Sequence, residues 1–174
     1  MVSPCAAAVI AVAWDSSLSP VDVRSLTPAQ RQRDTTGDLF ALGRAKTGRA
    51  AAATLTRRST KVLDAYLAKL AVEVADNAPI FRNRSGRAYS KDTLGDDFRD
   101  VRALVFGPKE RRTLADFRRS GAVEVLRGGG TVEQLGNKLA NDFATSTNLQ
   151  KTYAPIDLAT VRQADAARRQ GRRK

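Results

Sequence analysis

Hydrophobic residues recur at helical spacing in several stretches of the chain. The longest pattern follows Ser59 and predicts an amphipathic helix that ends at the polar pair Asp76-Asn77, before Pro79; its apolar face holds Val62, Leu63, Tyr66, Leu67, Leu70 and Val74. A second amphipathic helix follows Ser90 and is stopped by Gly107-Pro108; its apolar face holds Leu94, Phe98, Val101 and Val105.

Two further helices are predicted by their start and stop signals. One begins near Thr113, carries Leu114, Phe117, Val125 and Leu126, and ends at the glycines 128–130. The next begins at Thr131, because Thr131 and Gln134 have the spacing of a capping box, and it runs through Leu139.

The N-terminal third of the chain mixes a helix with short strands. The apolar run 6–14 predicts a core helix, which the polar and proline-containing residues 15–20 break before a helical turn at 21–26. Residues 39–42 and 50–55 are strand candidates on either side of a Gly-containing polar turn at 46–49. We therefore expect a mainly α domain with a small antiparallel β-sheet (α+β).

The net charge of the chain indicates what kind of molecule it binds. The chain has 174 residues, which suits one domain or one domain plus a tail, and 30 Lys and Arg against 18 Asp and Glu give a net charge of +12. Such an excess favours a polyanion, most simply nucleic acid, although basic proteins are common and part of the charge lies in the last residues. Residues 158–174 are helix-compatible but end in a basic run, so we expect them to fray unless DNA or another subunit orders them.

The numbers of cysteines and histidines limit the kinds of catalytic and metal site that the chain can form. Cys5 is the single cysteine and the chain has no histidine, which excludes an internal disulfide and argues against metal or Ser-His-Asp chemistry. We expect no cofactor. The apolar run 6–14 is too short to span a membrane and has no basic leader, so the default is a cytoplasmic protein without a membrane partner.

One motif then stands out in the C-terminal half. The run Ala115-Asp116-Phe117-Arg118-Arg119-Ser120-Gly121-Ala122 is followed by Leu139-Ala140-Asn141 and then by Tyr153 before Ala154-Pro155. This order resembles the tyrosine recombinase (phage integrase) family, whose pattern is His-Asp-Leu-Arg-Arg-Thr-Gly-Ala, then Leu-Gly-His, then the nucleophilic tyrosine. The resemblance implies the integrase catalytic-domain fold.

The resemblance assigns roles to two of these residues. Cleaving a phosphodiester with a tyrosine needs a nucleophile, cations that stabilise the phosphorane, and an acid for the departing hydroxyl. Tyr153 would be the nucleophile and Arg118 the arginine that clamps the phosphate, although each has a structural alternative, a core aromatic and a helix-surface arginine. The other tyrosines that we considered, Tyr66 and Tyr89, are interpreted as packing residues.

The remaining assignments concern the acid and the DNA contacts. Lys46, in the predicted hairpin turn, resembles the family's hairpin lysine, which is thought to enter the minor groove and protonate the leaving 5′ oxygen; a solvated turn lysine is the alternative. DNA-backbone contacts are expected from basic residues beside these positions: Arg44, Arg49, Arg119 and Lys151.

The chain also departs from the family pattern. Ser19 stands where the family has its first arginine, with Arg24 as the nearest substitute; Ala115 and Asn141 stand where it has histidines. Asn141 retains a hydrogen-bonding side chain and is expected to assist as a donor, whereas the side chain of Ala115 neither donates nor accepts. The stretch from Asn141 to Tyr153 is also longer than the family's common form.

Three functions remain open from the sequence. The first is a phage or mobile-element integrase that performs site-specific recombination through a 3′-phosphotyrosine, without metal or small-molecule substrate. Residues 1–157 would be the catalytic domain, without the N-terminal DNA-clamping domain, and residues 158–174 a basic tail. It would act on double-stranded DNA, alone or as a homo-oligomer, in a bacterial or phage-derived, nucleoid-associated setting.

The second function is a non-catalytic, DNA-binding remnant of an integrase, which the residues at positions 19, 115 and 141 motivate. The third is an unrelated basic helical protein that binds RNA or an acidic partner.

Overall fold

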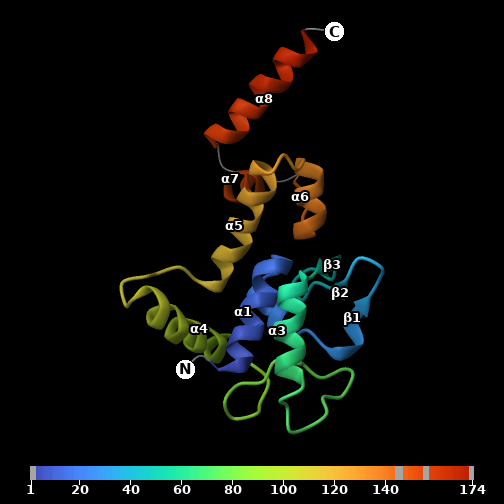
Figure 1. Ribbon diagram of the computed structural model, residues 1–174, viewed down its shortest axis with the longest axis vertical. Coiled ribbons are helices and arrows are strands. Elements are labelled where there is room, and N and C mark those ends of the chain that lie inside the picture. The colour runs from blue at the N-terminus through green and yellow to red at the C-terminus, as the bar shows by residue number, and fades with distance from the viewer. Residues whose placement is uncertain (1–2, 144–146, 155–156, 173–174) are drawn as a thin grey trace.

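The computed structural model describes residues 3–143, 147–154 and 157–172, and it places helices around one small sheet (Figure 1). In chain order the elements are α1 (Pro4–Ser16), α2 (Pro20–Arg24), the 3-10 helix η1 (Pro28–Gln30), β1 (Arg31–Arg33), β2 (Asp38–Gly43), β3 (Ala50–Thr54), α3 (Arg57–Leu67), α4 (Lys91–Phe106), α5 (Leu114–Arg127), α6 (Val132–Leu139), α7 (Thr147–Tyr153) and α8 (Leu158–Gly171). This architecture confirms the expected mainly α fold with a small antiparallel sheet.

Helix α1 is the centre of the main core, as its apolar sequence predicts. Ser3 caps it by accepting a hydrogen bond from the amide of Ala6, and Pro4 occupies the first turn. Val9 and Val12 are fully buried, and small residues such as Ala8 and Ala13 let α3 and α5 approach closely. Figure 1 shows α1 and α3 side by side.

The sheet has the strand order β1-β2-β3 and is antiparallel throughout. Phe40 of β2 lies opposite Ala53 of β3, and both side chains are fully buried against the helices. Both predicted strands are confirmed, whereas β1 was not predicted. The turn between β2 and β3 is closed by hydrogen bonds from the amides of Arg44 and Gly48 to the carbonyls of Arg49 and Arg44, 2.9 and 2.8 Å long.

Helix α3 is shorter than its hydrophobic pattern predicts. It ends at Leu67, so the prediction of a helix reaching Val74 was wrong. After Leu67 the backbone turns more tightly, because the amides of Lys69 and Leu70 donate to carbonyls three residues earlier (3.0 and 3.1 Å). The Tyr66 hydroxyl then holds a later segment against the helix, since it donates to the carbonyl of Ile80 (2.8 Å) and accepts from the amide of Arg82 (3.0 Å). Val74 still packs against the core, but from irregular backbone.

The helices predicted from capping signals are confirmed. Ser90 begins α4 and Gly107 follows its last residue with a φ of 87°. The capping box of α6 is present, because Thr131 Oγ1 accepts from the amide of Gln134 (3.1 Å) and Gln134 Oε1 accepts from the amide of Thr131 (2.9 Å). Tyr66 and Tyr89 are both buried, as expected of packing residues.

Helix α5 connects two hydrophobic clusters. Its Phe117 belongs to the main core and makes edge-on contacts with the rings of Trp14 and Phe98, at centroid distances of 5.1 and 5.5 Å. Its Ala122 belongs to a second cluster, which includes Leu135 and Leu139 of α6, Phe143, and Leu149 and Tyr153 of α7. Arg118 therefore lies at the junction of the two clusters.

Helix α8 extends away from the rest of the molecule (Figure 1), and none of its residues is buried. Its contacts lie near its start, where Arg127 pairs with Asp157 (2.9 Å) and Gln163 donates to the carbonyl of Arg127 (2.7 Å). The last residues of the basic run, 173–174, lie outside the described residues. None of the helices that the described residues form is both long and apolar enough to cross a lipid bilayer.

Candidate functional site

The site is built around the side chain of Arg118, which is only 4% exposed. Its Nη1 donates to the carbonyl oxygen of Ser17 (2.7 Å), and its Nη2 donates to the carbonyl oxygen of Leu139. These carbonyls lie at the C-terminal ends of α1 and α6, where backbone oxygens lack intrahelical partners and carry the negative end of the helix dipole. The carbonyl oxygens at the ends of these two helices thus hold the Arg118 side chain in place.

Both helix ends turn through a left-handed residue. Ser17 has a φ of 54° and Ala140 a φ of 45°, and these are the non-glycine residues with positive φ in the described parts of the chain. Such conformations cost of order 1 kcal/mol each and often accompany functional sites. Gly121 permits the close approach of α5 to the first of these ends, because a Cβ at this position would lie 2.4 Å from Ser17 Oγ.

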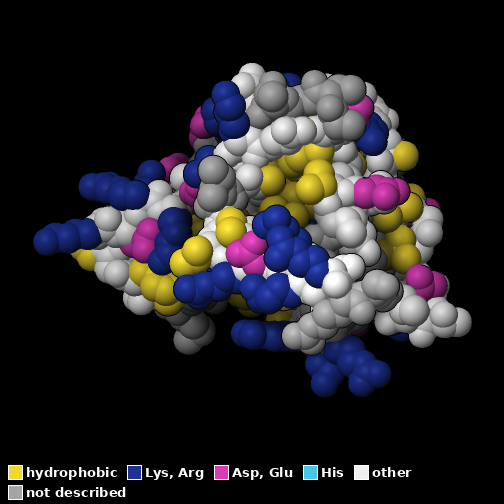
Figure 2. Space-filling model, turned by 90° about the horizontal axis from the view of Figure 1, so that it is seen from above, with side chains coloured by type: hydrophobic (Ala, Val, Ile, Leu, Met, Phe, Trp, Pro, Cys, Tyr) yellow, Lys and Arg dark blue, Asp and Glu magenta, His cyan; other side chains and the backbone are white. Residues whose placement is uncertain are grey.

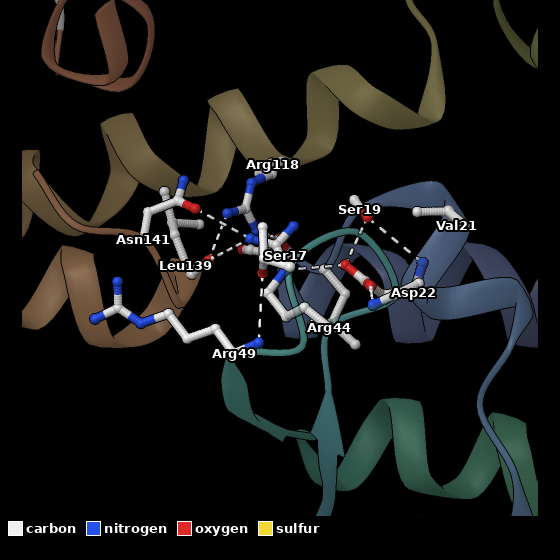
Figure 3. Close-up of polar contacts among 12 residues, drawn as sticks. Ser17, Ser19, Val21, Asp22, Arg44, Arg49, Arg118, Leu139 and Asn141 are labelled. Atoms are coloured by element: carbon white, nitrogen blue, oxygen red, sulfur yellow. Dashed lines mark hydrogen bonds and ion pairs between the residues drawn. The ribbon is translucent and has the colours of Figure 1, made fainter. Parts of the chain in front are cut away.

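A second arginine, Arg44, reaches the same carbonyl oxygen from the β-hairpin (Figure 3). Its Nη1 donates to Leu139 O (3.1 Å) and to Asn141 Oδ1 (3.0 Å), and its Nε donates to Asp22 Oδ2 (3.1 Å). Arg44 and Arg118 therefore converge on one oxygen atom, although they come from different elements.

Asp22 holds Arg44 in this position. Its carboxylate is 1% exposed and accepts hydrogen bonds from Ser19 Oγ (2.6 Å), the amide of Ala45 (2.8 Å) and Arg44 Nε. Burial alone would raise the pKa of Asp22, but these hydrogen bonds and the charge of Arg44 together lower it below 3.8. Asp22 is therefore ionised at neutral pH and ties the base of the hairpin to α2.

The site carries a surplus of positive charge. Arg44 is paired with Asp22, but no carboxylate forms an ion pair with Arg118 among the residues that the structure describes. Burial lowers the pKa of Arg118, and the charge of Arg44 lowers it further, while Tyr153 and Asp22 act in the opposite direction. A buried guanidinium held by neutral carbonyls is suited to bind an anion.

Tyr153 lies directly over Arg118. It is the last residue of α7, its ring packs edge-on against Phe143 with a centroid distance of 6.3 Å, and the guanidinium carbon of Arg118 lies 5.4 Å from the centroid of the Tyr153 ring. The structure thus brings together four residues that the sequence singled out: Tyr153, Arg118, Asn141 and Arg44.

The side chains of the other predicted residues surround this group without a described hydrogen bond to it, although the Arg49 carbonyl accepts from the amide of Arg44. Lys46 and Arg49 are exposed on the hairpin turn, and Figure 3 shows the Arg49 side chain extending away from the hydrogen-bonded network. Arg119 is exposed on α5, 3.9 Å from Asp116, and Lys151 is exposed on α7. Pro155, which follows the predicted nucleophile, lies outside the described residues.

Arg24 lies elsewhere. Its Nη1 donates to the carbonyl of Tyr89 (3.1 Å), so the structure brings Arg44 to Arg118 and directs Arg24 to the loop before α4. Ala115 is exposed at the start of α5. The described residues contain no cluster of three or more His, Cys, Asp or Glu side chains suited to a metal ion.

One face of the molecule carries clustered positive charge. Seen from the α8 end, Figure 2 shows Lys and Arg side chains gathered in a band across the middle of this face, below a hollow lined by hydrophobic side chains. Such a band favours association with a polyanion.

Sequence reasoning missed the residues that position the arginines. These are Ser17 and Leu139, which act through backbone oxygens, and Asp22, which acts through its buried carboxylate. A backbone acceptor leaves no signal in a sequence. Asp22 did leave a signal in the sequence, because it is an acidic residue in a short helix and lies close to Ser19, the position at which the family has an arginine.

Solved structures of recombinases share this fold. The chain aligns with the crystal structure of XerA recombinase with a TM-score of 0.73 and 17% identity, over 96% of this chain and 57% of that one. It aligns with the XerH site-specific recombinase bound to difH substrate, in a pre-cleavage complex, with a TM-score of 0.71 and 14% identity, over 91% of this chain and 45% of that one. The Tn1549 transposon integrase in complex with transposon right end DNA gives a TM-score of 0.63 and 12% identity, over 92% and 57%.

These similarities establish a tyrosine recombinase catalytic-domain-like fold, as the sequence motif predicted. The chain spans about half the length of the structures it matches. No family model matches the sequence, and no curated protein matches it closely enough to count as a relative.

Proposed function

We propose that this chain is the catalytic domain of a phage or mobile-element integrase that cleaves and rejoins double-stranded DNA at a specific site. The observation that carries the proposal is the placement of Tyr153 over Arg118, a buried arginine that no described carboxylate neutralises. A phosphodiester is an anion that would complete this site, and the tyrosine hydroxyl is the nucleophile at hand.

The proposed reaction uses four side chains. Tyr153 Oη releases its proton to solvent water and attacks the scissile phosphorus, a 3′-phosphotyrosyl bond forms, and the bond to the 5′ oxygen breaks. Arg118 stabilises the negative charge that develops on the non-bridging oxygens, and Asn141 assists through its amide. Lys46 supplies the proton that the 5′ oxygen needs to leave as a hydroxyl. Attack by a 5′-hydroxyl on the phosphotyrosine then reverses the step and rejoins a strand.

The neighbouring cations would hold the DNA. Arg49, Arg119 and Lys151 are exposed, and each can contact a backbone phosphate without a loss of internal structure. We assign residues 1–157 to the catalytic domain and residues 158–174 to a basic tail that binds DNA or a neighbouring copy in a homo-oligomer on DNA. The proposed setting is the bacterial cytoplasm, at the nucleoid.

A second function is favoured by specific residues. Ser19 and Ala115 stand where the family has charged or proton-donating groups, and Ala115 is exposed with no donor to offer. A DNA-binding module that retains the fold and the basic face without the chemistry would satisfy these observations. It binds duplex DNA in a salt-sensitive manner and forms no covalent product.

A covalent-adduct assay distinguishes the two functions. Nicked duplexes from the DNA that flanks this gene are incubated with the protein and with Tyr153→Phe, and the products are separated on a denaturing gel. An adduct that disappears in the variant supports the integrase. Confirmed binding of the same duplexes without an adduct supports the DNA-binding module, and failure to bind even at low salt contradicts both.

A further inference from the structure

We propose that Arg44 takes over the phosphate-binding role of the arginine that is missing at position 19. The inference rests on the proposed function, because the ligand is the scissile phosphate. It goes beyond a contact with the DNA backbone, since it makes Arg44 a catalytic residue that binds the same phosphate as Arg118.

The first observation is that positions 19 and 44 share one atom. Ser19 Oγ donates to Asp22 Oδ2 (2.6 Å) and Arg44 Nε donates to the same oxygen (3.1 Å). Side chains from the two positions therefore converge on a single buried carboxylate. The guanidinium of Arg44 thus reaches the same carboxylate oxygen as the side chain at position 19.

The second observation is that the guanidinium groups of Arg44 and Arg118 lie close to one another. Both guanidinium groups donate to Leu139 O, and only 10% of the Arg44 side chain is exposed. Two like charges in a poorly hydrated site repel one another, and burial together with Arg44 lowers the pKa of Arg118. A bound phosphodiester would relieve this repulsion by placing a negative charge between the two cations.

The third observation is that Arg44 retains a free donor. Its Nε and Nη1 are occupied by Asp22, Leu139 and Asn141, whereas its Nη2 has no hydrogen-bond acceptor among the described residues. The occupied donors fix the plane of the guanidinium, and the Nη2 group is left for a ligand. This arrangement is a preorganised phosphate donor rather than a side chain saturated by its own fold.

A titration tests anion binding without requiring cleavage. Dimethyl phosphate, a phosphodiester of one charge, is added to the full chain at constant ionic strength while the side-chain N–H signals of the arginines are followed by NMR. We expect Arg44 and Arg118 to shift together with one shared dissociation constant, and Arg24, bonded to the Tyr89 carbonyl, to remain unchanged. A shift of Arg118 alone, or of neither residue, overturns the inference.

Substitutions test the role in cleavage. Arg44→Ala should slow formation of the covalent adduct by roughly a hundredfold to a thousandfold, the usual cost of one oxyanion donor. Because this variant leaves Asp22 buried without its cation and risks unfolding, Arg44→Lys is measured beside it. Arg44→Lys keeps the charge beside Asp22 but loses the planar fork, so we expect a smaller loss of Tm than in Arg44→Ala and cleavage at least tenfold slower than in wild type.

A double substitution that moves the arginine from position 44 to position 19 makes the test specific to position 19. Ser19→Arg combined with Arg44→Ala should regain at least tenfold of the missing rate, whereas Ser19→Ala with Arg44→Ala, which also removes the helix cap, should not. Folded Arg44 variants that cleave at the wild-type rate overturn the inference and leave the proposed function intact. Absence of any adduct in the wild-type protein instead contradicts the proposed function, and the titration still decides whether Arg44 binds a phosphodiester.

Discussion

The guanidinium carbon of Arg118 lies 5.4 Å from the centroid of the Tyr153 ring. This contact joins α5 to α7 and holds the proposed nucleophile beside the proposed phosphate ligand. Arg118 is in turn held by the ends of α1 and α6, so the position of the site depends on four helices that meet at one side chain. The predictions below test the parts of this arrangement separately.

Arg118→Lys should lower both stability and cleavage. A single ammonium on a flexible stem cannot reproduce the planar bridge between the carbonyls of Ser17 and Leu139, so at least one of these two buried hydrogen bonds is lost. We expect the free energy of unfolding to fall by about 1–3 kcal/mol in a urea titration. Arg119→Lys, one position along the same helix but exposed, is the matched control and should leave the unfolding curve unchanged. A stable Arg118→Lys protein would show that the bridge is not structural.

Lys46→Ala should affect cleavage but not stability, because the side chain is exposed on the hairpin turn. If Lys46 protonates the leaving oxygen, the adduct should form about a hundredfold to ten-thousandfold more slowly. A duplex with sulfur in place of the bridging 5′ oxygen should restore the rate, since a thiolate leaves without a proton. Arg49→Ala, in the same turn, should show no such rescue. If the Lys46 variant cleaves the sulfur-containing duplex as slowly as the ordinary duplex, Lys46 is not the acid.

Asp22 should give the protein a characteristic acid sensitivity. Hydrogen bonds and the charge of Arg44 hold the pKa of Asp22 below its ordinary value in the folded state. The stability that Asp22 contributes is therefore present above the pKa of the unfolded chain and is lost as pH falls through the folded pKa. Asp22→Asn should be less stable than wild type by about 3–5 kcal/mol near neutral pH, because Arg44 loses its buried partner. The difference between the two unfolding free energies should shrink as pH falls from neutral through the ordinary range of a carboxyl group and then through the lowered pKa of Asp22. A constant difference would mean that Asp22 does not titrate as described.

Removal of residues 161–174 should leave the fold intact and weaken DNA binding. None of the residues of α8 is buried, and its described hydrogen bond to α5, from Gln163 to Arg127, lies on the surface. We expect Tm to change little, and the slope of log K against log salt to become shallower by roughly 0.9 for each phosphate that the tail neutralises in the full chain. Arg168→Gln with Arg169→Gln separates charge from helix formation, and a large loss of Tm on deletion would contradict this role for the tail.

Elements with clear start and stop signals could be predicted from the sequence, and others could not. The boundaries of α4 and α6 follow from their caps at Ser90 and Thr131 and from Gly107. Strand β1 has no hydrophobic alternation, because it is held by hydrogen bonds to β2 and by ion pairs from Arg31 and Arg33 to Asp38. The pattern after Leu67 continues at helical spacing, yet the amides of Lys69 and Leu70 bond to carbonyls three residues earlier and the backbone leaves the helix there.

Part of the site could likewise be predicted from the sequence, and part could not. The motif around Arg118 and the tyrosine before Pro155 stand out in the sequence, and the structure brings Arg118 and Tyr153 into contact. The convergence of Arg44 on Arg118 depends on contacts with Asp22 and Leu139, residues far from Arg44 along the chain. Pattern and spacing carry no record of such contacts, so the sequence placed Arg44 only among the DNA-backbone ligands.

The most direct test of the proposed function is the denaturing-gel assay with nicked duplexes from the DNA flanking this gene, run with wild type and Tyr153→Phe. The variant keeps the ring over Arg118 and loses only the hydroxyl, so its fold and DNA affinity should match those of wild type. We predict a covalent protein–DNA adduct with wild type and none with Tyr153→Phe. An adduct that survives in the variant, or no adduct from wild-type protein bound to the same duplexes, would contradict the assignment of Tyr153 as the nucleophile.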